Sequence, residues 1–292
     1  MKVLRTMFGL GIILVLGFSC KNAPNIKSRF ITKLDSLKSE EEIIHFIKEK
    51  FPEVESGNFK LNAALPDFAV KSEAPRWSLN DVDSNGYKDL VVNLNLDNTF
   101  YSYIIFADSS KFNICPLSSI WEYAGSFSRF RIINKEPAIL VSGYAMGNDL
   151  KTDTLVYKYD SFIEYNSYAS NNRINKIEMQ LSAFGVESDH FPNINAFIDF
   201  TIDSSSCHKW FSNPSYKDFV YTIGKADIHK ILNILRYADL NKIKRRKIDT
   251  GKSNQPGSKM RIFADKKTLA VNDYGLEGSY TLKELYKLVY KY

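Results

Sequence analysis

The chain has 292 residues, which is enough for one large domain or two domains of ordinary size. Its 44% hydrophobic and 25% charged residues are typical of globular proteins and exclude general disorder. The formal net charge of +6 becomes +4 once Lys2 and Arg5 of a removable signal segment are subtracted, and a charge this small argues against nucleic acid as a partner.

The chain begins with the pattern of an export signal. Basic Lys2 and Arg5 precede an apolar run of 11 residues from Met7 to Gly17. A helix that crosses about 30 Å of hydrocarbon needs roughly 20 apolar residues, so this run is too short for a transmembrane span. A short apolar run behind positive charge, ending in small residues, indicates a secretory signal.

The residues that lead to Cys20 resemble the lipobox of bacterial lipoproteins. Gly17-Phe18-Ser19 precede the cysteine, and Leu16 stands four residues before it, where the commonest pattern has leucine three before. The resemblance implies a signal peptide at 1–19 and a lipidated Cys20 as the new first residue, held in the lipid bilayer by more than one acyl chain. It predicts a cell-envelope lipoprotein of the outer membrane, on its periplasmic or surface side. The alternative is a plain secretory signal with an incidental cysteine.

Residues 20–38 are predicted to form a polar tether and the start of a first helix, which we place over 31–51. Ser39 followed three residues later by Glu42 is a capping box, which satisfies two free backbone N–H groups at a helix start. Pro52 ends the helix. Its apolar face comprises Ile43, Ile44, Ile47 and Phe51.

From about 59 to 165 short apolar runs alternate with turn residues. The 17 tyrosines and 20 phenylalanines of the chain favour pleated, half-buried surfaces, and Asp97-Asn98 is typical of a tight hairpin turn. Strands do not alternate with helices, which argues against a parallel doubly wound sheet. We therefore predict an antiparallel, β-rich domain over 39–165 behind the first helix.

The asparagine- and serine-rich stretch at 166–175 is predicted to be a linker, followed by a smaller α+β domain at 176–292. This domain is expected to hold strands around 196–203 and 218–224 and a helix over 226–240. Two further strands are expected around a turn at 265–267, and a last helix begins at Thr281, with Glu284 completing a capping box. The predicted fold class of the whole chain is α+β.

The end of the chain resembles a domain of unknown function found in exported bacterial proteins. Asp273-Tyr274-Gly275 and the pair Leu285-Tyr286 carry this resemblance. It implies a strand, a turn and a closing helix, and it implies no activity.

The stretch DVDSNGYKD at 81–89 gathers three carboxylates and an amide into one turn. Like charges this close repel unless a cation neutralises them, and Ca²⁺ takes six to eight oxygen ligands in proteins. Gly86 supplies the permissive dihedral angles that a sharp turn at the sixth position needs. The predicted ligands are the side chains of Asp81, Asp83, Asn85 and Asp89, the last directly or through water, and the backbone carbonyl of Tyr87.

Residues Asn80 to Leu94 resemble the calcium loops of FG-GAP and VCBS-type repeats, which lie between two strands. An EF-hand would carry a bidentate glutamate at the twelfth position, where this chain has Val92. That family builds multi-bladed propellers, but this chain shows no second copy, so the resemblance implies one local calcium site and no propeller. Magnesium fits less well because it prefers few protein ligands in a strict octahedron. The other alternative is a solvated, Asx-rich turn without metal.

Cys115 and Cys207 are the remaining cysteines. They could pair in an oxidising compartment, but we expect them in different domains and predict two buried free thiols.

Taken with the export signal, these patterns predict a non-catalytic binding or accessory module of the cell envelope whose partner is an envelope protein or a glycan. The alternative is an envelope hydrolase with its site in the cleft between the two domains. No catalytic residue is predicted, because the sequence holds no GxSxG motif, and His190 and His229 are isolated from any partner of recognisable spacing.

Overall fold

The computed structural model describes most of the chain from residue 30 onward. The described residues are 30–52, 54, 59–60, 75–96, 99–118, 125–144, 150–168, 172–182, 192–213, 215–245, 256–265, 267–276 and 278–290. The predicted signal peptide, Cys20 and the Asp97-Asn98 turn lie outside them. None of the described helices is long and apolar enough to cross a membrane.

Three antiparallel sheets and a few helices make up the described fold, which is α+β in composition. The first sheet holds β1 (Phe59–Lys60), β2 (Trp77–Asn80), β3 (Asp89–Leu96), β4 (Thr99–Asp108) and β5 (Lys111–Leu117). The second sheet holds β6 (Ser126–Ile133), β7 (Glu136–Tyr144), β8 (Leu150–Lys158) and β9 (Ser161–Glu164). The third sheet holds β10 (Ile174–Ser182), β11 (Asn193–Asp199), β12 (Ser204–Trp210), β13 (Phe219–Tyr221), β14 (Gly257–Ala264) and β15 (Lys267–Tyr274). The helical segments are η1 (Lys33–Ser36), α1 (Glu40–Lys50), α3 (Lys225–Tyr237), α4 (Leu240–Arg245) and α5 (Tyr280–Tyr290).

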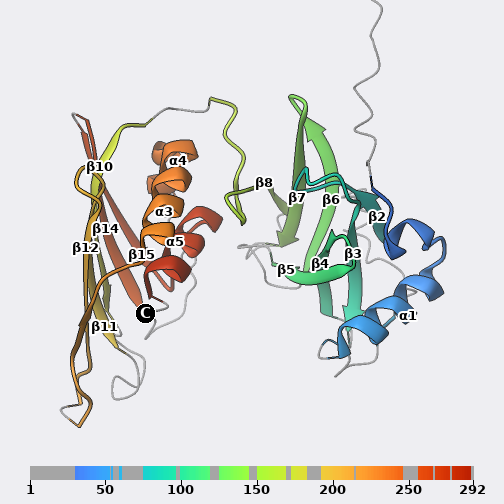
Figure 1. Cartoon of the computed structure of the whole chain (residues 1–292), viewed down its shortest axis with the longest axis horizontal. Helices are drawn as coiled ribbons and strands as arrows, with labels where there is room; N and C mark the ends of the chain where they lie inside the picture. The colour runs from blue at the N-terminus through green and yellow to red at the C-terminus, as the bar shows by residue number, and fades with distance from the viewer. Residues whose placement is uncertain are drawn as a thin grey trace, which may run out of the picture.

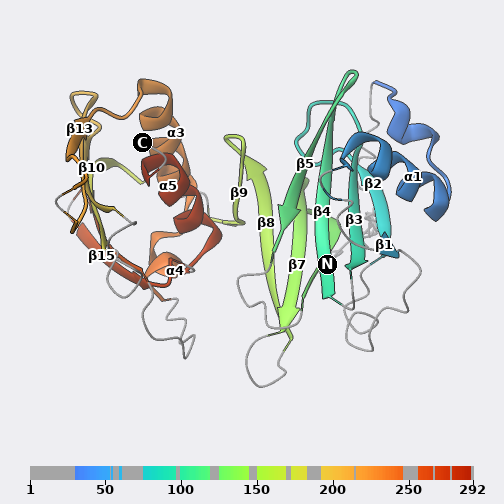
Figure 2. The ribbon, with the colours of Figure 1, turned by 90° about the horizontal axis from the view of Figure 1, so that it is seen from below.

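These elements stack in layers across the molecule (Figures 1 and 2). Helix α1 lies at one end, followed by the first sheet, the second sheet, the three helices α3, α4 and α5, and the third sheet at the opposite end. Each layer buries apolar side chains against the next, and this burial is the main favourable contribution to folding.

The alternation of side chains along β3 explains how the first sheet is buried on both faces. Leu90, Val92 and Leu94 pack in one cluster with α1, whereas Val91 packs in another with the second sheet. Successive residues of a strand point to opposite faces, so an almost continuous apolar run suits a strand that is covered on both sides.

Helix α1 is shorter than the helix predicted over 31–51. It begins after Ser39, whose hydroxyl accepts from the Glu42 N–H, so the predicted capping box is confirmed. Residues 33–36 form a separate 3₁₀ turn capped by Thr32, and Leu37 between the two segments is extended. The prediction was too long because two successive N-caps divide one apolar stretch into two short helices.

The second sheet joins the two halves of the chain. Ile139, Val141 and Leu155 face the first sheet. Val156 and Ile163 belong to the same buried cluster as helices α3 and α5.

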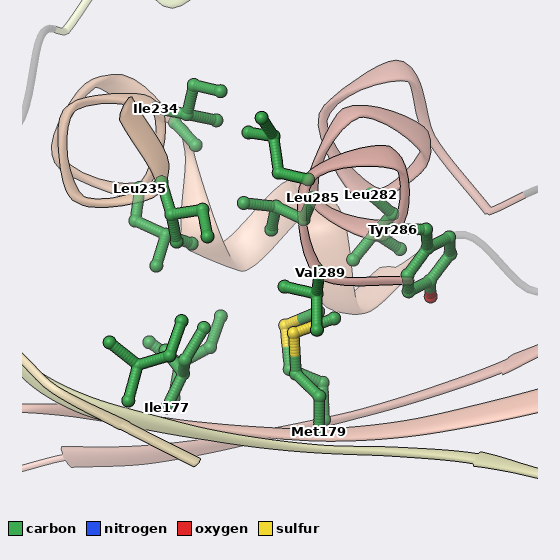
Figure 3. Packing of buried hydrophobic residues seen from close by; sticks show 14 of the residues in the cluster. Ile177, Met179, Ile234, Leu235, Leu282, Leu285, Tyr286 and Val289 are labelled. Carbon is green, nitrogen blue, oxygen red and sulfur yellow. The ribbon is translucent and has the colours of Figure 1, made fainter. Parts of the chain in front are cut away.

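In the C-terminal half, helices α3 and α5 pack side by side on one face of the third sheet (Figure 3). Ile177 and Met179 of β10 point toward Leu235 of α3 and toward Leu285 and Val289 of α5. The predicted helix over 226–240 is confirmed as α3, and the predicted strands around the turn near 265 are confirmed as β14 and β15, with Lys267 already in β15.

The third sheet contains two strands that the sequence patterns did not predict, β10 and β12. The predicted linker at 166–175 includes residues that bind α3. Asn166 Nδ2 donates to Tyr237 O over 2.8 Å, and Asn172 Nδ2 donates to Ala238 O over 3.1 Å, so both amides bind carbonyls at the end of that helix.

The last helix begins one residue earlier than predicted, and its N-terminus is capped differently. Ser279 Oγ accepts from the Leu282 N–H over 3.1 Å. Glu284, the predicted capping partner, accepts instead from Ser161 Oγ on β9. The predicted capping box at Thr281 is therefore wrong.

Both described cysteines are free thiols in different sheets, Cys115 on β5 and Cys207 on β12. Cys207 is buried as predicted and donates to the Tyr221 hydroxyl over 3.0 Å. Cys115 is only partly buried, which corrects the prediction for that residue. Burial raises the pKa of both thiols.

Candidate metal centre

The acidic stretch forms the connection between β2 and β3. Asn80 pairs with Asp89 across the two antiparallel strands, so the loop returns close to its starting point. Val82 of this loop is buried and packs with residues of the first and second sheets. Ser84 and Gly86 both have positive φ angles, of 62° and 91°, which lets the loop turn sharply. The loop is thus held at both ends by the sheet and tightly curled between them.

This curled loop brings the three predicted carboxylates together. One oxygen from each of Asp81, Asp83 and Asp89 lies within 4.8 Å of the other two. Asp89 is fully buried, Asp81 is only 8% exposed, and Asp83 is intermediate. Three buried or half-buried carboxylates at this spacing are a set of oxygen donors that could hold one divalent cation.

Asp89 is fixed by backbone N–H groups of the loop and of β4. Its Oδ2 accepts from the Val82 N–H over 2.8 Å, and its Oδ1 accepts from the Ala107 N–H of β4 over 2.9 Å. Burial raises the pKa of Asp89 to about 7. The two N–H donors oppose this increase in pKa, while the carboxylates of Asp83 and Asp81 add to it.

The pKa of Asp83 is raised by the same two causes, burial and a neighbouring carboxylate. Burial raises the pKa of its carboxyl group, and the neighbouring Asp81 carboxylate raises it further, against the lowering effect of the Asn85 N–H. In the metal-free protein the cluster therefore resists carrying its full negative charge, which a bound cation would relieve.

One carboxylate oxygen of Asp81 accepts a hydrogen bond, and the other has no partner among the described residues. Its Oδ2 accepts from the Gly86 N–H over 3.0 Å. Its Oδ1 is buried and has no hydrogen-bond partner in the described part of the chain. A buried oxygen without a partner costs free energy, about 1–3 kcal/mol for a typical polar group and more for a charged one. A metal ion in the cluster would supply the missing partner.

Asn85 and Tyr87 organise the loop in the described conformation. Asn85 Nδ2 donates to Asp83 Oδ2 over 3.1 Å and to Ala107 O over 2.8 Å, while its Oδ1 accepts from the Tyr87 N–H over 2.8 Å. The Asn85 oxygen is thus used inside the loop, and it would have to turn toward the carboxylates to bind an ion. Ligation by Asn85 and by the Tyr87 carbonyl remains a prediction.

Two contributors to this site were missed by sequence reasoning. The N–H of Ala107 fixes Asp89, and the carbonyl of Ala107 fixes Asn85. Ala107 lies 18 residues beyond Asp89 on β4 and contributes only backbone atoms, so its side chain offers no signal in the sequence.

A second polar site lies where the hydrolase alternative would place one, between the second sheet and the helices. This cavity has a volume of about 290 Å³, and Asp153, Glu164, Asp239 and Lys242 are among the residues that line it. Glu164 is committed to the start of α5, because its carboxylate accepts from the N–H groups of Tyr280 and Thr281 over 2.7 and 2.9 Å. It also accepts from the Thr281 hydroxyl over 2.5 Å. This carboxylate caps a helix, and the described residues that line the cavity include no histidine.

Comparisons of the chain with protein-family models, with curated proteins and with solved structures found no match.

Proposed function

We propose that this protein is a cell-envelope lipoprotein, anchored through an acylated Cys20, that acts as a non-catalytic binding or accessory module. A structural calcium ion stiffens the loop between β2 and β3. The observation that carries the calcium assignment is Asp81 Oδ1, which is buried beside two further carboxylates and has no hydrogen-bond partner among the described residues. The export signal supports the location, because calcium is plentiful outside the cytoplasm.

Calcium is the favoured ion because of the number and kind of donors. Three carboxylates give a formal charge of −3 around a doubly positive ion, and Asn85 and the Tyr87 carbonyl are within the same short loop. Ca²⁺ accepts such a crowded and irregular set of oxygens, whereas Mg²⁺ demands a regular octahedron at shorter distances. The ion's role is structural in this proposal, since the cluster belongs to a loop that is fixed by the sheet on both sides.

The test is thermal unfolding of the metal-stripped, detergent-solubilised chain with and without calcium. Calcium at a hundredfold excess over its Kd is expected to stabilise the protein by about 2.7 kcal/mol. The double variant Asp83→Ala/Asp89→Ala should lose this response. An unchanged melting temperature of the wild-type chain on calcium removal would falsify the calcium assignment.

The anchor is tested separately by fractionating cells that express the chain. Wild-type protein should sediment with membranes, and Cys20→Ala should appear in the soluble exported fraction. Continued membrane attachment of the variant would exclude the lipid anchor without affecting the calcium assignment.

A further inference from the structure

The third sheet has one face that no described helix covers. Its inner face packs on α3 and α5, and the opposite face lies at the end of the molecule farthest from α1 (Figures 1 and 2). This outer face is hollowed into two adjoining grooves with volumes of about 660 and 290 Å³. Gln180, Lys259 and Asn272 line both grooves. The outer face therefore holds a continuous depression that runs across several strands.

A row of hydrogen-bonding side chains crosses this depression from strand to strand. The strand register places His208, Asn195, Gln180, Lys259 and Asn272 side by side, one from each of five neighbouring strands. Neighbouring strands lie about 4.8 Å apart, so the row presents a polar group at each such interval. Within the described part of the chain, the side-chain amides of Gln180, Asn195 and Asn272 make no hydrogen bond.

One positive charge in this row is left without a counter-charge. Arg261, in the neighbouring row, forms an ion pair with Glu178, and Lys176 pairs with the same carboxylate over 3.3 Å. Lys259 forms no ion pair among the described residues and is flanked directly by Gln180 and Asn272. An ammonium group between two amides suits a ligand that carries a carboxylate and neighbouring hydroxyl groups.

The other side of the polar row has small residues in its middle and aromatic residues at its ends. Ser182 and Gly257 pair with each other, and the same register continues to Tyr274. A Cβ added at Gly257 would make only an ordinary contact with the described residues, 3.9 Å from the backbone oxygen of Asp273. At the far end Trp210 stacks on His208 with ring centroids 5.1 Å apart. Small residues leave room for a chain to lie across the sheet, and the exposed ring of Tyr274 suits a stacking contact.

We propose that this face binds an acidic polysaccharide, with a carboxylate of the glycan at Lys259 and its hydroxyl groups on the amide row. A single uncompensated cation favours this ligand over an anionic membrane surface or a nucleic acid, both of which need clusters of basic residues. An extended peptide would be expected at a strand edge, where backbone groups are unpaired, rather than across the face. The inference rests on the proposed binding role and uses no residue of the metal centre.

The test is a binding titration of the full chain in detergent with a hyaluronan oligosaccharide, which carries carboxylates. A chitin oligosaccharide, which has the same N-acetylglucosamine units and no carboxylate, serves as the neutral probe. Lys259→Gln should weaken hyaluronan binding about tenfold, the effect of losing one charge-assisted contact. Gly257→Trp should abolish binding by filling the groove. The matched control is Lys267→Gln, which removes an exposed lysine at the β14–β15 turn outside both grooves and should leave binding unchanged.

The inference would be overturned by no binding of hyaluronan by the wild-type chain, by equal binding of both oligosaccharides, or by an equal loss of hyaluronan affinity in the two lysine variants. Stronger binding to poly-glutamate or to phosphatidylglycerol vesicles would overturn it in favour of an acidic protein or a lipid partner. The calcium response of each variant is measured on the same samples. The glycan-binding proposal can therefore fail or hold independently of the metal centre.

Discussion

The Gly86 N–H donates to Asp81 Oδ2 over 3.0 Å, which fixes the Asp81 carboxylate and leaves its other oxygen buried without a hydrogen-bond partner in the described structure. At this turn Gly86 has a positive φ, which most other residues adopt only with strain. The curvature of the loop and the position of this unpartnered oxygen are therefore linked through a single contact.

The charge of Asp81 should destabilise the metal-free protein and stabilise the calcium-bound one. Asp81→Asn keeps the shape of the side chain and removes the charge, so the metal-free variant should be at least as stable as the metal-free wild type. Calcium should raise the melting temperature of the wild type by about 5–10 °C at a hundredfold excess over Kd, and should leave the variant unchanged. Asp108→Asn, an exposed carboxylate at the end of β4, is the matched control and should keep the full calcium response. An equal response of both variants would contradict the assignment of Asp81 as a ligand.

The stability of the metal-free protein should fall as the pH rises through the window from about 4 to about 7. The pKa of Asp89 is about 7 in the folded protein against 3.8 for an ordinary aspartate, so the folded state binds more protons than the unfolded state in this window. The stabilisation from the protonated Asp89 carboxyl group is complete below about pH 4 and is lost as the pH rises through 7. Urea unfolding of the metal-stripped chain at a series of pH values measures this slope, and Asp89→Asn should reduce it. Identical slopes in the two proteins would show that Asp89 does not titrate as described.

Calcium should also order the segment that leads into the first helix. The Phe30 N–H donates to Gly86 O over 3.2 Å, the Phe30 ring stacks on Tyr87 at 4.7 Å, and Lys88 pairs with Asp35 at 2.8 Å. Three consecutive residues of the loop therefore hold residues 30–35 against the sheet. Hydrogen exchange at these amides should slow on calcium addition in the wild type.

Phe30→Ala should lose most of this protection while calcium still binds, because no atom of Phe30 belongs to the carboxylate cluster. Ile31→Ala is the matched control, since Ile31 is 87% exposed, and it should behave like the wild type. Protection that is independent of calcium in all three proteins would mean that the loop and the segment are not coupled.

Glu164 should contribute to the attachment of α5 to the second sheet. Its carboxylate accepts three hydrogen bonds at the start of α5, where the helix dipole also favours a negative charge. Glu164→Ala should lower the free energy of unfolding by about 1–3 kcal/mol. Asp203→Ala removes an exposed carboxylate that lies 3.8 Å from His229, and this control should cost less than about 1 kcal/mol. If denaturant titrations gave comparable losses in the free energy of unfolding for the two variants, Glu164 would not have this role.

Local sequence patterns predicted the local parts of the structure. The grouping of Asp81, Asp83 and Asp89 depends on residues within one nine-residue loop, and the Ser39–Glu42 capping box spans one helical turn. Both were predictable because the interacting groups are close in sequence and their spacing alone sets their geometry.

The features that the sequence did not reveal depend on distant partners. The cap of α5 uses Glu164, 116 residues before Tyr280, in place of the nearby Glu284. Strand β12, with the sequence SSSCHKW, has little intrinsic strand preference and is held by pairing with β11 and β13 on either side. The contacts of Ala107 with the loop are made by backbone atoms, which every residue possesses.

The most direct measurement is a calorimetric titration of calcium into the metal-stripped, detergent-solubilised full chain at pH 7.5, with Asp81→Asn titrated in parallel. We predict one calcium ion per wild-type chain and none for the variant, and proton release on binding when the titration is repeated below pH 7. Absence of calcium binding by the wild-type chain at millimolar concentrations, or equal binding by the variant, would contradict the metal centre and the role proposed for it.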